Sequence, residues 1–171
     1  MLSFISEENY EIHKGYLRTL KLKYSILEKS INDIKNKNID EIIKQKMKRK
    51  DKQDVLELLF DIVLHETFFS SFSDNTFLTS DMISSLFGSE ASFLNEVFRF
   101  AMRTPSGFIC IYRTTDRIHI STSEELDSLY RYGAPELAID VSEHAYFLDY
   151  GFDKERYLRS ALPHFNLSRL V

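Results

Sequence analysis

The chain has 171 residues, of which 43% are hydrophobic and 28% charged, a composition typical of a soluble globular protein that forms its core without disulfides. Its net charge of −4 argues against general nucleic-acid binding, and its apolar runs are too short to span a membrane. A single cysteine and an N-terminus without signal-peptide features lead us to expect a cytoplasmic protein.

Two long helices are predicted in the first half of the chain, at about residues 6–35 and 52–72. In both, apolar residues recur at three- and four-residue steps, which is typical of amphipathic helices. The apolar face of the first helix carries Ile12 and His13, and that of the second carries His65. An antiparallel hairpin of these helices would bring the two imidazoles together. Taken singly, each histidine is more often a hydrogen-bonded core residue than a metal ligand.

Basic residues gather in and just after the polar segment 36–51, which joins the two helices and has room for a short helix. The densest part comprises Lys44, Lys46, Lys48, Arg49, Lys50 and Lys52. Such a cluster attracts RNA or other anions, but no aromatic residues interleave with it to stack on bases. We therefore interpret it as a solvated connection and do not expect nucleic acid as a partner.

The second half of the chain mixes short helices with strands. Ser80-Asp81 is typical of the start of a short helix, and Gly88-Ser89 is typical of its end and of the start of a second helix, which ends near Pro105. Runs of β-forming residues at 108–113 and 117–122, separated by a polar turn, predict a hairpin.

A third strand is predicted at residues 137–141, after a loop that spans residues 123–135. A final helix is expected to begin after Asp153 and to end before Pro163. The element order is two long helices, shorter helices, three antiparallel strands and a closing helix, which defines an α+β fold class.

Residues with metal-binding chemistry lie at the end of the third predicted strand and just after it, where Asp140 and His144 stand four positions apart. A carboxylate and a neutral imidazole suit Mn, Fe or Zn, although a helix-capping Asp and a core histidine would give the same spacing. Together with His13 and His65, they make four candidate ligands in elements predicted to be buried. Since unpaired buried imidazoles and carboxylates are costly, one metal ion bound by all four would remove that cost.

The segment 140–146, Asp-Val-Ser-Glu-His-Ala-Tyr, is similar to the D-V-W-E-H-A-Y signature of the iron/manganese superoxide dismutases. Residues 11–13 resemble the family's first-helix ligand region, and residues 65–69 resemble its second-helix ligand with the aromatics that follow. Further landmarks of the family in the same order are Phe87-Gly88-Ser89, Ser106-Gly107-Phe108 and Ile120-Ser121-Thr122-Ser123. The resemblance covers almost the whole chain.

By this resemblance, residues 1–75 would form a helical hairpin domain and residues 76–171 an α/β domain with a three-stranded antiparallel sheet. One Fe or Mn ion per chain would lie between them, held by His13, His65, Asp140 and His144. The family converts superoxide to dioxygen and hydrogen peroxide. It also pairs into homodimers, in which Glu143 would reach the ligand histidine of the other subunit.

The resemblance also has departures around the expected metal. The family's signature tryptophan is Ser142, and the aromatic positions after the second ligand and after Gly107 hold Phe69 and Phe108. The family's active-site glutamine comes from one of two positions, which correspond here to Asp61 and to the neighbourhood of Glu125. Either carboxylate could hydrogen-bond to metal-bound solvent, but it would add negative charge where superoxide approaches.

The first helix departs as well. The family tyrosine beyond the first ligand corresponds to Lys21, which could attract superoxide, while Tyr16 lies nearer to the ligand. The gate histidine corresponds to Leu17 and its tyrosine partner to Phe147. Two alternatives therefore stand beside a dismutase: a metal-binding or redox protein of the same fold with little dismutase activity, and a structural or interaction protein.

Overall fold

The computed structural model describes residues 2–28, 50–73 and 81–170. The segment between the two long helices lies outside the described residues, as do residues 74–80. The side chains of the basic cluster at positions 44–52 are also outside the described part of the chain, so its predicted solvated role stays a prediction.

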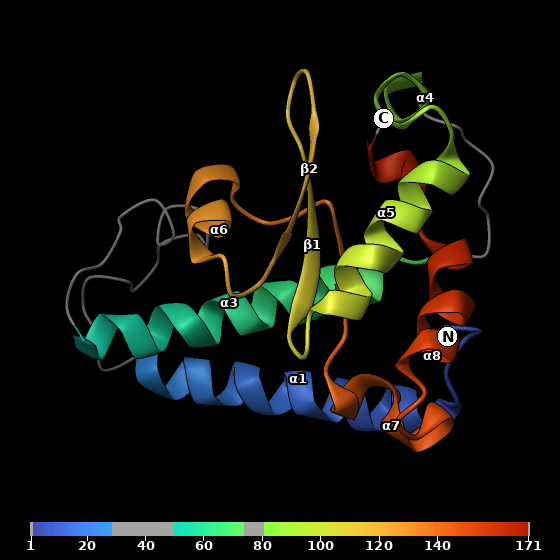
Figure 1. Ribbon diagram of the computed structural model, residues 1–171. Helices are drawn as coiled ribbons and strands as arrows, with labels where there is room; N and C mark the ends of the chain where they lie inside the picture. The colour runs from blue at the N-terminus through green and yellow to red at the C-terminus, as the bar shows by residue number, and fades with distance from the viewer. Residues whose placement is uncertain (1, 29–49, 74–80, 171) are drawn as a thin grey trace.

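Two long helices form an antiparallel hairpin, with α1 at Glu7–Glu28 and α3 at Lys50–Ser70 (Figure 1). The start of α1 is capped because the Ser6 hydroxyl accepts a hydrogen bond from the Asn9 amide at 3.2 Å. Leu17 and Leu20 of α1 pack with Ile62 of α3. Ile12 was expected on this buried face, and that expectation is wrong: it is 57% exposed, because the helix turns its neighbour His13 inward instead.

A three-stranded antiparallel sheet follows, made of β1 (Phe108–Arg113), β2 (Ile118–Thr122) and β3 (Leu137–Asp140) in the order β2-β1-β3. The predicted hairpin and third strand are confirmed. Phe108 pairs with Asp140 and Ile111 with Leu137, so the end of β3 lies beside the beginning of β1. Every residue of β3 is buried, because helix α3 covers it.

Short helices surround the sheet (Figure 1). They comprise α4 (Asp81–Phe87), α5 (Glu90–Arg103), α6 (Leu126–Tyr132), α7 (Glu143–Tyr150), α8 (Lys154–Ala161) and the 3-10 turns η1 (Leu162–His164) and η2 (Leu167–Leu170). Helix α5 packs on the β1–β2 hairpin, and α6 lies on the opposite side of this hairpin. The architecture is α+β, with the long helices beneath one end of the sheet.

Two of these helices differ from the sequence prediction. The segment 123–135 was expected to be a loop but contains α6, and α7 follows β3 where no helix was expected. Both are short, with seven and eight residues, so neither spans enough turns to display a helical repeat of apolar residues. Burial of Leu129 in α6 and of Ala145 and Tyr146 in α7 supplies the stability that local propensity lacks.

One continuous core joins the helical hairpin to the sheet and the later helices. The C-terminal end of α3 is tied to β3 because the Ser71 hydroxyl accepts a hydrogen bond from the Ala138 amide at 2.7 Å and donates to the Thr67 carbonyl. The buried Tyr157 hydroxyl of α8 donates to the Asp140 carbonyl at 2.9 Å. These contacts fix β3 against the end of α3 and against α8. Among the described helices, none has both the length and the apolar character needed to cross a bilayer.

Candidate metal centre

Four elements deliver the candidate ligands to one point below the sheet. His13 comes from α1, His65 from α3, Asp140 from the last position of β3 and His144 from the first turn of α7. One potential ligand atom from each residue lies within 4.8 Å of all the others. The oxygen Asp140 Oδ2 is 2.9 Å from His144 Nε2, 3.3 Å from His13 Nε2 and 3.9 Å from His65 Nε2. Residues far apart in sequence thus converge on a single carboxylate oxygen.

Three of the four converging atoms are buried without hydrogen-bond partners. His13 Nε2, His65 Nε2 and Asp140 Oδ2 are shielded from solvent, and none of them makes a hydrogen bond despite the short separations. Leaving such groups unpaired costs free energy, and the cost disappears when their lone pairs face one cation. Imidazole and carboxylate are suitable donors for Fe and Mn, so the residues fit a mononuclear transition-metal site.

The electrostatics of the cluster centre on Asp140. Burial by itself raises the pKa of Asp140, but the contacts with His13 and His144 outweigh it and hold this pKa well below its usual value. Burial lowers the pKa of His13, which keeps its imidazole neutral. Burial also lowers the pKa of His144, but the adjacent Asp140 carboxylate outweighs this and raises it. The carboxylate is therefore anionic, as a metal ligand must be.

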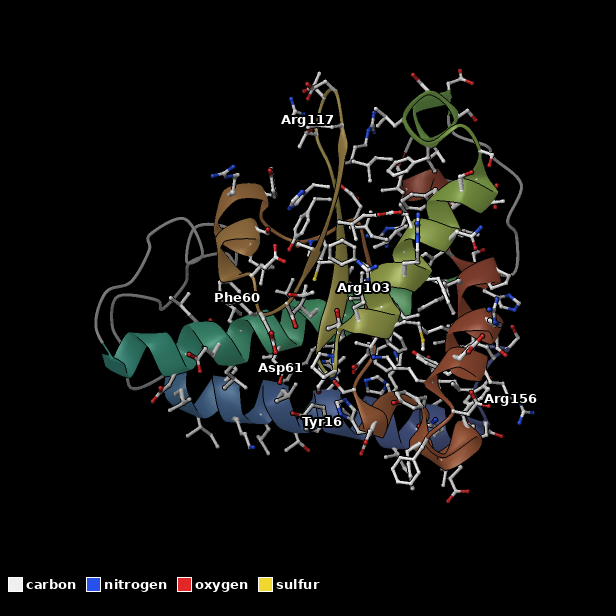
Figure 2. All side chains as sticks on the ribbon, in the orientation of Figure 1. Tyr16, Phe60, Asp61, Arg103, Arg117 and Arg156 are labelled. Atoms are coloured by element: carbon white, nitrogen blue, oxygen red, sulfur yellow. The ribbon has the colours of Figure 1, made fainter. Side chains whose placement is uncertain are left out.

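Asp61 sets the orientation of the second candidate ligand. His65 Nδ1–H donates to the Asp61 backbone carbonyl at 2.7 Å and lies 3.1 Å from the Asp61 carboxylate oxygen Oδ1. Because Nδ1 carries the proton, Nε2 keeps its lone pair directed toward the cluster. The Tyr16 hydroxyl donates to the other Asp61 carboxylate oxygen at 3.4 Å, and Figure 2 shows the two residues on the facing helices α1 and α3. Tyr16, Asp61 and His65 are thus linked by hydrogen bonds beside the centre.

Aromatic rings pack around the imidazoles. The ring centroid of Phe69 is 5.1 Å from that of His13, and the ring centroid of Phe108 is 4.9 Å from that of His65. Both rings therefore shield the cluster from solvent. The ring centroid of Tyr16 is 5.1 Å from that of His65 and 5.3 Å from that of His144. Burial and the Asp61 carboxylate raise the pKa of Tyr16.

Ser142 stands at the position where the D-V-W-E-H-A-Y signature has tryptophan, and its hydrogen bonds connect two segments of the backbone. Its amide donates to Asp140 Oδ1 at 2.8 Å, and its hydroxyl accepts from the Gly107 amide at 2.9 Å. Gly107 has φ of 92°, and an added Cβ there would lie 2.5 Å from the Ser123 hydroxyl, so only glycine fits this approach. The segment before β1 is thus attached to the strand that carries Asp140 by a small polar residue.

Other residues singled out in the sequence lie away from the cluster. Lys21 pairs with Glu66 at 2.5 Å on the surface. Glu125 precedes α6 and lines a separate hollow with His119. Phe147 is 47% exposed on α7 and packs on Phe152, and Glu143 is exposed in the first turn of α7.

Sequence reasoning missed Asn9, which is only 1% exposed. Its side-chain amide donates to the Ala145 carbonyl at 3.1 Å and to the Asp149 carboxylate at 2.9 Å, joining α1 to α7. Asn9 stands one helical turn before His13, and Ala145 directly follows His144. The signal available in the sequence was a polar residue four positions before a candidate ligand on the same helix face.

Three imidazoles and one buried carboxylate form a candidate site for a single metal ion, with the donor set typical of mononuclear non-haem metalloproteins. Residues 76–170 match the model of the C-terminal domain of iron/manganese superoxide dismutases. The chain therefore belongs to the iron/manganese superoxide dismutase family. No curated protein sequence matched the chain. The matched region contains Asp140 and His144, whereas His13 and His65 come from the helical hairpin that precedes it.

Proposed function

We propose that the protein is a superoxide dismutase with one Fe or Mn ion per chain, bound by His13, His65, Asp140 and His144. The observation that supports this best is the set of potential ligand atoms within 4.8 Å of one another, three of them buried and without hydrogen bonds. Family membership supplies the reaction, in which superoxide is converted to dioxygen and hydrogen peroxide.

A bound Fe or Mn ion would supply the one-electron redox step that alternately oxidises and reduces superoxide. The chain's own residues prepare the site for it. Asp61 holds the proton of His65 at Nδ1 and so leaves Nε2 free. The Ser142 amide occupies Asp140 Oδ1, which leaves Oδ2 as the oxygen that faces the imidazoles. The Tyr16 hydroxyl donates to Asp61, and the Tyr16 ring contacts the rings of His65 and His144, so Tyr16 is our candidate proton-handling group.

We further propose a cytoplasmic homodimer built on the surface of α7. The side chain of His144 is 45% exposed, and Phe147 and Leu148 beside it are 47% and 51% exposed. A second subunit packed there would bury these groups, with Glu143 contacting His144 of the partner. Size-exclusion chromatography with light scattering tests the dimer. The division into domains at 1–75 and 76–171 belongs to the same proposal.

A second candidate is a metal-binding or redox protein with little dismutase activity. It is favoured by the anionic Asp61 beside the centre and by the hydroxyl of Ser142 at the family's tryptophan position. A structural or interaction role without metal is a third candidate, and the buried unpaired atoms of the cluster speak against it.

Metal analysis of the purified chain, paired with a superoxide-consumption assay on Fe-loaded and Mn-loaded protein, separates the three. The proposal requires about one ion per chain and turnover that follows metal content. Metal without turnover would leave the second candidate. A chain that retains no Fe or Mn after loading would leave only the third.

A further inference from the structure

A hollow of about 550 Å³ opens beside the candidate ligands. Its walls come from α1, α3, α6, α7 and the start of β1, and His65 and His144 form part of its lining. Pockets for small organic ligands usually measure about 300–1,000 Å³. Superoxide is close to a water molecule in size, and a water occupies about 30 Å³ in the liquid. The hollow is therefore much larger than the family's substrate requires.

The charge on the lining is negative. Three carboxylates contribute, from Asp54, Glu57 and Asp61, and the described residues that line the hollow include no Lys or Arg. Arg117 at the tip of the β hairpin and Arg156 on α8 lie on other parts of the molecule (Figure 2). Low-dielectric walls concentrate the field of such groups, so the hollow favours a cation over an anion.

The remaining lining combines flat apolar surface with a few hydroxyl groups. Phe60, Leu64, Phe108 and Leu129 are buried side chains that border the hollow, and Tyr16 and Ser123 add hydroxyls. Apolar walls with a small number of polar groups are typical of sites that hold an organic molecule in one orientation. Aromatic rings also attract a cation or stack on a second ring.

We propose that this hollow binds a small organic cation, an amine carried on an aromatic or branched apolar body. The ammonium group pairs with the carboxylates of Asp54 and Asp61, and the apolar body lies against Phe60 and Phe108 beside the His65 imidazole. Because these groups belong to the protein itself, binding does not require the metal ion. The proposal goes beyond the dismutase reaction and stands or falls separately from it.

The test is isothermal titration calorimetry of 2-phenylethylamine into the full chain, in a chelator-treated form and in a Mn-loaded form. We expect saturable 1:1 binding with Kd below about 1 mM in both forms, given the size of the ligand. The matched probes 2-phenylethanol, which is neutral, and 3-phenylpropionate, which is anionic, should bind at least about tenfold more weakly. No saturation by the amine, or equal binding of the anion, would overturn the proposal.

Two variants locate the binding site. Asp54→Asn removes an exposed carboxylate of the lining and should weaken amine binding about fivefold, while the matched control Glu8→Gln, exposed in the first turn of α1, should leave it unchanged. Leu58→Phe fills part of the hollow and should weaken the binding of the amine and the alcohol alike. Circular dichroism checks that each variant folds. Unchanged amine affinity in folded Asp54→Asn and Leu58→Phe would place the amine elsewhere and refute the proposal. Since no measurement uses superoxide, a failure of the dismutase proposal would leave these results unaffected.

Discussion

The four converging candidate ligands and the hollow beside them differ in how closely they follow the family. The candidate ligands reproduce the complete set expected from the resemblance, and three of the four are almost fully buried. The hollow carries Ser142 at the position that corresponds to the family's tryptophan and Asp61 at one of the two positions that correspond to its glutamine, and it is wide and acidic. In our proposals, metal binding depends on His13, His65, Asp140 and His144, which we call the inner set, whereas the choice of reactant depends on the lining of the hollow. Metal binding and the choice of reactant can therefore vary separately within one fold.

Asp140→Asn should have the largest effect, because it acts at the centre of the inner set. The variant keeps the size of the side chain and an acceptor for the Ser142 amide, but it removes the anionic oxygen that faces three imidazoles. We expect metal content to fall from about one ion per chain to near zero and the metal-dependent rise in Tm to vanish. Mass spectrometry of the metal and thermal unfolding measure both. Full metal content in the variant would show that the inner set is not the binding site; Asp81→Asn, in the first turn of α4, is the control.

Asn9→Ala should come next, because it removes two hydrogen bonds between α1 and α7 and leaves the Ala145 carbonyl without this donor. We expect a loss of roughly 1–3 kcal/mol in the free energy of unfolding, measured by urea denaturation of the metal-free chain. Thr19→Ala, on an exposed part of α1, should lose far less. Equal losses in the two variants would argue that Asn9 does not hold α1 and α7 together.

Asp61→Asn tests whether Asp61 supports the candidate metal ligands or only lines the hollow. The backbone carbonyl still holds His65 Nδ1, but the carboxylate oxygen at 3.1 Å is lost. We expect metal affinity to fall about tenfold in competition with a chelator. Asp54→Asn changes the lining of the same hollow without an observed contact to a candidate ligand and should retain wild-type metal affinity. If both variants bind metal with the same affinity, Asp61 does not contribute to metal binding and only lines the hollow.

Tyr16→Phe should have the smallest effect on stability and metal content. Its hydroxyl makes one long hydrogen bond of 3.4 Å, and the residue is 42% exposed. We expect the free energy of unfolding to change by less than about 0.5 kcal/mol and metal content to stay unchanged. A fall in superoxide turnover of the loaded protein, with metal content constant, would support the proton-handling role. Unchanged turnover would remove Tyr16 from that role.

Much of this arrangement was open to prediction from the sequence. His13 and His65 were identified because apolar residues repeat around them with the period of a helix, and Asp140 and His144 because a short apolar run precedes them. Hydrophobic period, capping residues and motif spacing are local properties, so the two long helices, the three strands and the four candidate ligands follow from the chain alone. Asp61 was singled out by the resemblance, as one of the two positions that correspond to the family's glutamine.

Only the tertiary structure decided the rest. Helices α6 and α7 are too short to show a period, and they exist because the core buries Leu129, Ala145 and Tyr146. Asn9 became informative only when α7 was placed against α1. The acidic hollow is built by side chains from five elements, and no local pattern records how far apart they will stand. The sequence by itself determined which residues are candidates to bind a metal, because each of them sits at a regular position in its own element. The space beside them depends on the distances between elements, which only packing sets.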